Sequence, residues 1–247
     1  IGAMFIPVFI EQLVMAVVAV LVSTLVKSEG TEAVAAITLL TSLNLLFQQS
    51  FIGIGVGVTV LVAQFRGKGD MRSTGRAALQ SLVLTTWISI ASSVLCYVFM
   101  NPILGLILAD SAPKVFEYGR IFMTFNLLVL PFMGIYMVSA AAIRGSGYSH
   151  ISLLATLTYN GTYALLAFLA VRFTDYGVLG VSVALLASGV LAACVGIRLL
   201  VRGNRYLKLG RFSLKLEGEI VRPMLKVGLP VMLENMFFQL GKLATQS

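Results

Sequence analysis

The chain has 247 residues, of which 58% are hydrophobic and only 11% are charged, and its formal net charge is +8 at pH 7. Soluble domains contain roughly 45–50% apolar and 25% charged residues, so this composition excludes an ordinary soluble protein and indicates an integral membrane protein. The basic excess lies in particular loops, a distribution that favours membrane topology over binding of nucleic acid.

Six apolar runs are long enough to cross a bilayer, whose ~30 Å hydrocarbon core requires about 20 helical residues. In chain order they cover residues 1–26, 33–65, 77–109, 121–143, 145–171 and 176–197, and a seventh begins near residue 229. We therefore expect an all-α integral membrane protein, with a six-helix transmembrane bundle followed by part of a seventh helix.

The loops predict how the chain crosses the membrane. Most of the 18 basic residues follow the second, fourth and sixth runs. By the positive-inside rule these loops are cytoplasmic, which places the N-terminus in the cytoplasm and the protein in the cell membrane. Anionic lipid headgroups are expected partners of the same basic residues.

The end of the chain resembles its beginning. Aligning the two stretches places Pro7 on Pro230 and Glu11 on Glu234. Six intervening spans is an even number, so the second copy would enter from the same side, as in a parallel transporter repeat. We expect an N-terminal lobe over 1–201, a cytoplasmic linker over 202–226, and the truncated first helix of a missing C-terminal lobe over 227–247.

Glu11 and Glu234 are acidic residues inside apolar runs, where a charge is costly and is by default a functional candidate. One interpretation is structural, because a carboxylate in an early helical turn meets the positive end of the helix dipole. The other is that each glutamate binds a cation or proton in a water-filled cleft. We favour the second.

The second run carries amides and glycines at helical spacing. Asn44 and Gln48 are four residues apart on one face, and Gly53 and Gly57 form a GxxxG pattern. The glycines predict a close helix contact. The amides form either an interhelical hydrogen bond or contacts to a substrate.

In the fifth run, Tyr159, Asn160 and Tyr163 form a polar and aromatic group that suits a substrate cleft. His150 is the only histidine, and Cys96 and Cys194 both lie in apolar runs, so we expect no metal site and no cofactor. No nucleophile with a base and no phosphate loop is visible, so an enzyme is not expected.

Five motifs in the correct order resemble the MATE (multidrug and toxic compound extrusion) family. They are "IPVFIEQ" (6–12), "GTEAVAAI" (30–37), "VAQFRGKGD" (62–70), "AAAIRGSGYS" (140–149) and "VGLPVMLEN" (227–235). The resemblance implies twelve spans in two bundles, about twice this length, and export of cationic or amphipathic compounds by alternating access, driven by proton or sodium entry. It matches Asn160 to a fifth-span asparagine, and Glu11 and Glu234 to glutamates near the start of each lobe.

Two positions depart from the family pattern. Ser23 stands where members commonly have a first-span aspartate, and Ala164 stands where some members have a second acid after the asparagine. The acidic cation site of the N-terminal lobe is thus expected to be absent, and coupling would fall to Glu11, to the other lobe, or to neither.

We therefore predict a secondary antiporter that exports cationic drugs or toxic compounds. A lipid-linked oligosaccharide flippase of the same superfamily is the alternative, although its cleft should carry more basic residues than these spans do. A seven-helix retinal photoreceptor, suggested by Lys242 in the seventh run, is a remote alternative because no aspartate lies in a span as counter-ion.

Overall fold

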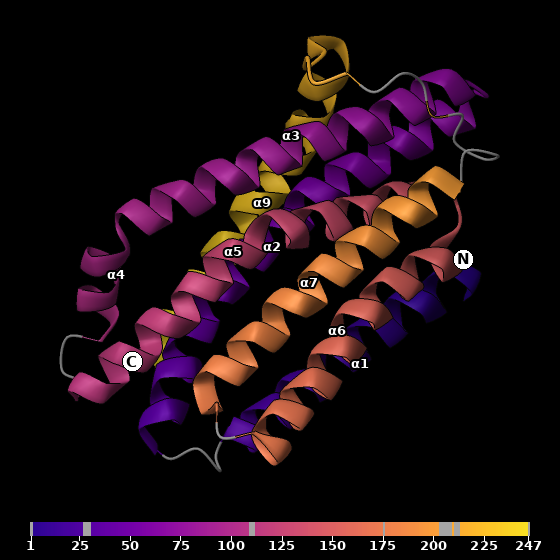
Figure 1. Cartoon of the computed structure of the whole chain (residues 1–247). Helices are drawn as coiled ribbons and strands as arrows, with labels where there is room; N and C mark the ends of the chain where they lie inside the picture. Colours follow the sequence, from indigo (N-terminus) through magenta and orange to yellow (C-terminus); the bar gives the residue numbers. More distant parts are fainter. Residues whose placement is uncertain are drawn as a thin grey trace.

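The computed structural model describes residues 2–26, 31–108, 112–174, 176–202, 209 and 213–246. All regular structure in these ranges is α-helical, which confirms the predicted fold class (Figure 1). The helices are α1 (Gly2–Val26), α2 (Thr31–Gly67), α3 (Met71–Val98), α4 (Met100–Ile107), α5 (Pro113–Gly145), α6 (Ser149–Phe173), α7 (Gly177–Arg202) and α9 (Gly218–Gln246).

Within the described ranges, five helices are long and apolar enough to cross a membrane: α2, α3, α5, α6 and α7. In α1 the shorter segment Phe9–Val22 is apolar. The third apolar run of the sequence is divided at Phe99 into α3 and the short α4. Pro102 explains the division, because it lacks the N–H that would bond the Val98 carbonyl and continue the helix.

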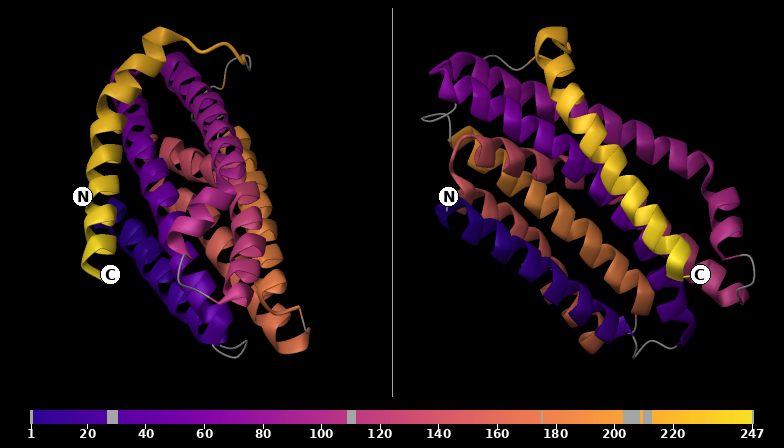
Figure 2. Two further views of the ribbon diagram at one scale, coloured as in Figure 1. Left: turned by 90° about the vertical axis from the view of Figure 1, so that its left-hand side faces the viewer. Right: turned by 180° about the vertical axis from the view of Figure 1, so that it is seen from behind.

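Helix α5 lies at the centre of the bundle and packs against α2, α3, α6 and α7. Helix α1 packs mainly on α6, whereas α9 packs mainly on α2. Figure 2 shows the result: α1 and α9 lie on different parts of the bundle, with α2 beside α9. The first helix therefore covers the surface formed by α6, and the last helix covers the surface formed by α2.

The motifs "VAQFRGKGD" (62–70) and "AAAIRGSGYS" (140–149) form two turns of the same type. Gly69 and Gly147 have φ angles of 75° and 82°, a left-handed conformation that glycine adopts at little cost. After α2, the Gly69 amide donates to the Arg66 carbonyl, and the following amide donates to the Phe65 carbonyl. After α5, the Gly147 amide donates to the Arg144 carbonyl, and the following amide donates to the Ile143 carbonyl. This is the Schellman pattern, which satisfies the last carbonyls of a helix and reverses the chain.

These turns lie at one end of the bundle, where α2, α5 and α7 end and α3 and α6 begin. We call it the basic end. It carries Arg66, Arg72, Arg76, Arg144, Arg198 and Arg202. Asp70 begins α3 there by accepting a hydrogen bond from the Ser73 amide at 3.0 Å, and its interactions with Ser73 lower the pKa of this carboxyl.

The glycines of α2 make the close helix contact that their spacing predicts. A Cβ atom on Gly57 would lie 2.4 Å from the Met224 carbonyl oxygen of α9, and one on Gly53 would lie 2.3 Å from the Met232 Cα. Only a hydrogen side chain fits at both positions. The GxxxG prediction is therefore confirmed, with α9 as the partner helix.

Helix α9 begins at Gly218, earlier than the helix start at residue 227 expected from the sequence. The additional turns are amphipathic: Ile220 and Met224 are buried one turn apart, while Arg222 and Lys226 are exposed. Charges on the exposed face make this segment look like a linker in the sequence, although its apolar face packs on the bundle.

Candidate functional site

Glu11 is buried inside the bundle, where 5% of the residue is exposed. Its Oε2 atom lies 2.9 Å from Arg144 Nη1, and its Oε1 atom accepts a hydrogen bond of 3.3 Å from Ser152 Oγ. The carboxylate thus joins three helices, because Glu11 belongs to α1, Arg144 to α5 and Ser152 to α6.

The turn between α5 and α6 brings the two partners of Glu11 together. Arg144 is in the last turn of α5, where a cation interacts favourably with the helix dipole. Ser152 is in the first turn of α6, and its single hydroxyl hydrogen is shared between Glu11 and the Ser149 carbonyl, which lies 2.8 Å from Oγ. The left-handed Gly147 reverses the chain between them, so both side chains reach the same carboxylate.

Aromatic side chains continue this site into the bundle. Tyr136 of α5 and Tyr159 of α6 stack with ring centroids 4.9 Å apart. Each lies about two helical turns from the Glu11 partner on its own helix, Arg144 or Ser152. We call the five residues Glu11, Arg144, Ser152, Tyr136 and Tyr159 the α1–α5–α6 cluster.

The Glu11 carboxylate of this arrangement can exist ionised, paired with Arg144, or protonated. The ionised Glu11 carboxylate accepts two hydrogen bonds and balances the Arg144 guanidinium. Protonation of Glu11 would remove the ionic part of this contact and leave Arg144, whose side chain is 27% exposed, free to turn toward water. The ion pair and the Ser152 contact together join α1 to the end of α5 and the start of α6.

Glu11 and Glu234, which the sequence pairs as equivalent positions, are in different surroundings. Glu234 is exposed on α9. Because α9 packs mainly on α2 while α1 packs mainly on α6, the described helices do not gather the two glutamates into one site.

The expected cleft residues divide between two helices. Asn44 and Gln48 are half-buried on α2, whose main packing partners are α5 and α9. On α6, Asn160 is buried, and its Nδ2 atom donates to the Thr156 carbonyl of its own helix at 3.0 Å. Tyr163 is half-buried one turn beyond Tyr159.

Of the two positions that depart from the family pattern, the structure describes the side chain of Ala164 but not that of Ser23. Ala164 is half-buried and packs against the apolar core, so no acid side chain occupies that position. The side chain of Ser23 lies outside the part of the chain that the structure describes.

Sequence reasoning missed Arg144, Ser152 and Tyr136 as site residues, and it treated Arg144 only as a topological charge. A usable signal was present: Arg144 is the single charge between two long apolar runs, directly before the glycine turn. A carboxylate in a neighbouring span is the natural partner of such a charge. No comparable signal marks Ser152 or Tyr136.

Comparison with known proteins gives one family match. The model of the family described as MatE matches residues 5–169. Over 192 residues the chain is 28% identical to a protein of Shewanella oneidensis named FAD transporter, covering 75% of this chain and 41% of that protein. It is 21% identical to the probable multidrug resistance protein NorM of Thermotoga maritima, covering 80% of this chain and 42% of the relative.

Solved structures agree on the fold. The outward-facing conformation of a multidrug resistance MATE family transporter of the MOP superfamily superposes with a TM-score of 0.86 at 21% identity, covering 94% of this chain and 51% of the other. A structure described as the inward-facing conformation of a multidrug resistance MATE family transporter of the MOP superfamily superposes with a TM-score of 0.82 at 21% identity, covering 90% of this chain and 50% of the other. The chain spans about half the length of the relatives and structures it matches.

Proposed function

The chain belongs to the MatE family, and on this premise we propose that it forms the N-terminal part of a secondary antiporter for cationic or amphipathic compounds. Export would proceed across the cytoplasmic membrane by alternating access, coupled to the entry of protons or sodium ions. Similarity to multidrug resistance proteins supports this class of cargo. The observation that carries the proposal is the buried Glu11 carboxylate, which joins α1 to α5 and α6.

Glu11 is proposed as the proton or cation acceptor of this lobe. Binding of a proton or a sodium ion at its carboxylate would compete with Arg144 and loosen the contact of α1 with the α5–α6 turn. Coupling needs such a difference between two states, because a ligand shifts a conformational equilibrium only through its differential affinity. Glu234 is proposed as the equivalent acceptor in the second lobe, which would begin with α9.

The cargo cleft is proposed to include Asn44, Gln48, Tyr159, Asn160 and Tyr163. Aromatic faces attract cations within about 6 Å, and the half-buried Tyr163 lies one turn beyond the buried, stacked Tyr159. The amides would orient the polar groups of the cargo.

The test uses the full-length natural protein in vesicles, with a proton or sodium gradient imposed and a cationic dye as cargo. We expect Glu11→Gln to abolish or strongly reduce gradient-driven dye transport, because the glutamine cannot ionise. Glu117→Gln removes an exposed carboxylate from α5 and serves as the matched control, with unchanged transport expected. Glu11 is not the acceptor if Glu11→Gln transports dye normally at every pH and with either ion.

A second candidate cargo is a flavin dinucleotide, favoured by similarity to the Shewanella oneidensis FAD transporter. Its pyrophosphate would require a basic partner, and Arg144 is the basic side chain of the α1–α5–α6 cluster. Vesicles loaded with FAD and with the dye distinguish the two cargos. If FAD is the cargo, Arg144→Gln should abolish release of FAD from the loaded vesicles and Arg144→Lys should retain part of it. The amount of folded protein is matched between variants, because Arg144→Gln also removes the ion pair with Glu11.

A further inference from the structure

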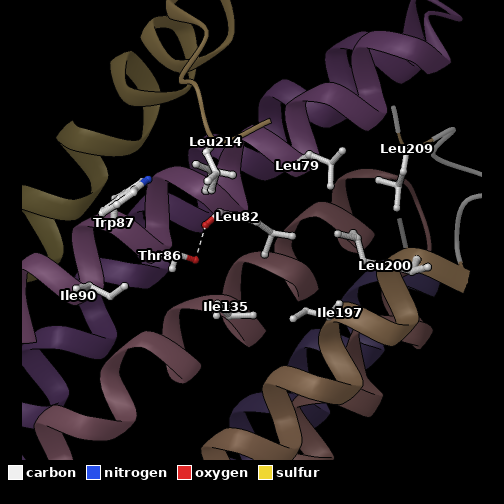
Figure 3. A pocket seen from close by; sticks show the side chains of 12 residues that line it. Leu79, Leu82, Thr86, Trp87, Ile90, Ile135, Ile197, Leu200, Leu209 and Leu214 are labelled. Carbon is white, nitrogen blue, oxygen red and sulfur yellow. Dashed lines mark hydrogen bonds between the residues drawn. The ribbon is translucent and has the colours of Figure 1, made fainter. Parts of the chain in front are cut away.

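An apolar cavity of about 540 Å³ lies near the basic end, between α3, α5 and α7 and away from the α1–α5–α6 cluster (Figure 3). Its size is within the roughly 300–1,000 Å³ of ligand pockets. Helix α3 contributes several residues between Leu79 and Ile90, α5 contributes Ile135, and α7 contributes Ile197, Leu200 and Val201. Leu209 and Leu214 complete the lining from the segment between α7 and α9.

The lining can bind apolar atoms but offers almost no hydrogen bonds. Among the described lining residues only Thr86 has a hydroxyl, and that hydroxyl donates to the Leu82 carbonyl of its own helix at 2.7 Å (Figure 3). The indole of Trp87 and the side chains of Ile197 and Val201 are about half exposed, so the cavity opens to the outside of the bundle. In a membrane protein that surface faces hydrocarbon chains.

The segment that carries Leu214 is fixed in place on α3. Gln80 is buried, and its amide group makes two contacts with this segment: Nε2 donates to the Lys215 carbonyl at 2.9 Å, and Oε1 accepts from the Glu217 amide at 3.1 Å. Arg76 also forms an ion pair with Glu217. These contacts hold the backbone next to Leu214 against α3, so this segment forms one edge of the cavity.

Three exposed basic residues directly follow lining residues in the sequence near the basic end. Arg198 and Arg202 are exposed, one turn apart on α7, next to the lining residues Ile197 and Val201. Lys215, also exposed, follows Leu214. Within the described ranges neither arginine has an acidic partner, and residues 203–212 contain no acid in the sequence.

We propose that this cavity is a binding site for one anionic phospholipid, with its acyl chains against α3, α5 and α7 and its phosphate at Arg198, Arg202 and Lys215. The apolar lining matches acyl chains, and the unpaired arginines match a headgroup of net negative charge. Helix α9 packs mainly on α2, touches α3 only lightly and contributes no residue to the lining, so the described chain leaves the cavity open to lipid. The proposal depends on membrane insertion and not on the proposed antiport.

Trp87 provides the measurement, because it lines the cavity and is the only tryptophan of the 247 residues. The full-length protein is reconstituted in vesicles in which either phosphatidylglycerol or phosphatidylcholine carries brominated acyl chains, which quench tryptophan fluorescence on contact. Subtracting the signal of Trp87→Phe isolates Trp87 from any tryptophan elsewhere. We expect half-maximal quenching at a roughly fivefold lower mole fraction of brominated phosphatidylglycerol than of brominated phosphatidylcholine.

The double variant Arg198→Gln/Arg202→Gln should abolish this headgroup preference while leaving quenching by phosphatidylcholine unchanged. Arg120→Gln/Arg172→Gln removes two exposed arginines from other parts of the bundle and should leave the preference intact. Equal quenching by the two lipids would show unspecific contact with the bilayer, and quenching by neither would show a cavity closed by protein. Either result, or a preference that survives in Arg198→Gln/Arg202→Gln, would overturn the proposal.

Discussion

Arg144 and Glu11, which lie at the end of α5 and inside α1, form an ion pair with an N–O distance of 2.9 Å. The two sides of the pair are unequally buried: 7% of the glutamate side chain is exposed, against 27% of the arginine side chain. Removing one partner therefore has a different cost from removing the other.

Arg144→Gln should destabilise the protein more than Glu11→Gln. The first change leaves a buried carboxylate without its cation, which costs about 3 kcal/mol or more. The second leaves an arginine that can reach water, at a cost of about 1 kcal/mol. Thermal unfolding of both single variants and the double variant in detergent measures the coupling, expected at about 1–3 kcal/mol. Additive effects would mean that the pair contributes nothing to folding.

Gly147→Ala should lower the unfolding temperature, because alanine at a φ of 82° costs roughly 1–2 kcal/mol. Gly67→Ala is the matched control: it lies near the equivalent turn, its φ is not positive, and its Cβ would meet no atom within 4 Å. We expect the control to be neutral or slightly stabilising. If both substitutions behave alike in a thermal melt, the left-handed turn is not what requires glycine.

Gly57→Ala should disrupt the packing of α9 on α2, because the new methyl group would lie 2.4 Å from the backbone oxygen of Met224. Backbone cannot move aside as a flexible side chain can, so we expect a loss of about 1–3 kcal/mol. Gly241→Ala, where a Cβ meets nothing within 4 Å, is the control on α9. The prediction is checked by comparing the thermal stability of the two variants, and equal stability would contradict the close α2–α9 contact.

Gln80→Ala should release the segment between α7 and α9 from α3. The variant loses both hydrogen bonds to the backbone at Lys215 and Glu217. Limited trypsin digestion should then cleave after Lys215 several-fold faster than in the unaltered protein. Gln64→Ala changes an exposed glutamine of α2 and should leave the cleavage rate unchanged. Equal rates in all three proteins would show that Gln80 does not hold this segment.

The sequence by itself determined the features that depend on neighbouring residues. Apolar runs predict the long helices, because a spanning segment must satisfy its backbone within itself. GxxxG in α2 predicts a close helix contact, because small side chains are needed there whichever helix approaches. The family can also be inferred from the sequence, because the segments at 62–70 and 140–149 and their order can be read without the structure.

Tertiary structure decided which distant residues meet. Glu11 is conspicuous in the sequence, but its partners Arg144 and Ser152 follow from the packing of α1 on α6 and from the Gly147 turn. The contact of Gln80 with the segment before α9, and the apolar cavity beside it, likewise join parts of the chain more than a hundred residues apart. Hydrophobic periodicity fixes that a helix is buried, but only side-chain packing between helices selects the face and the partner.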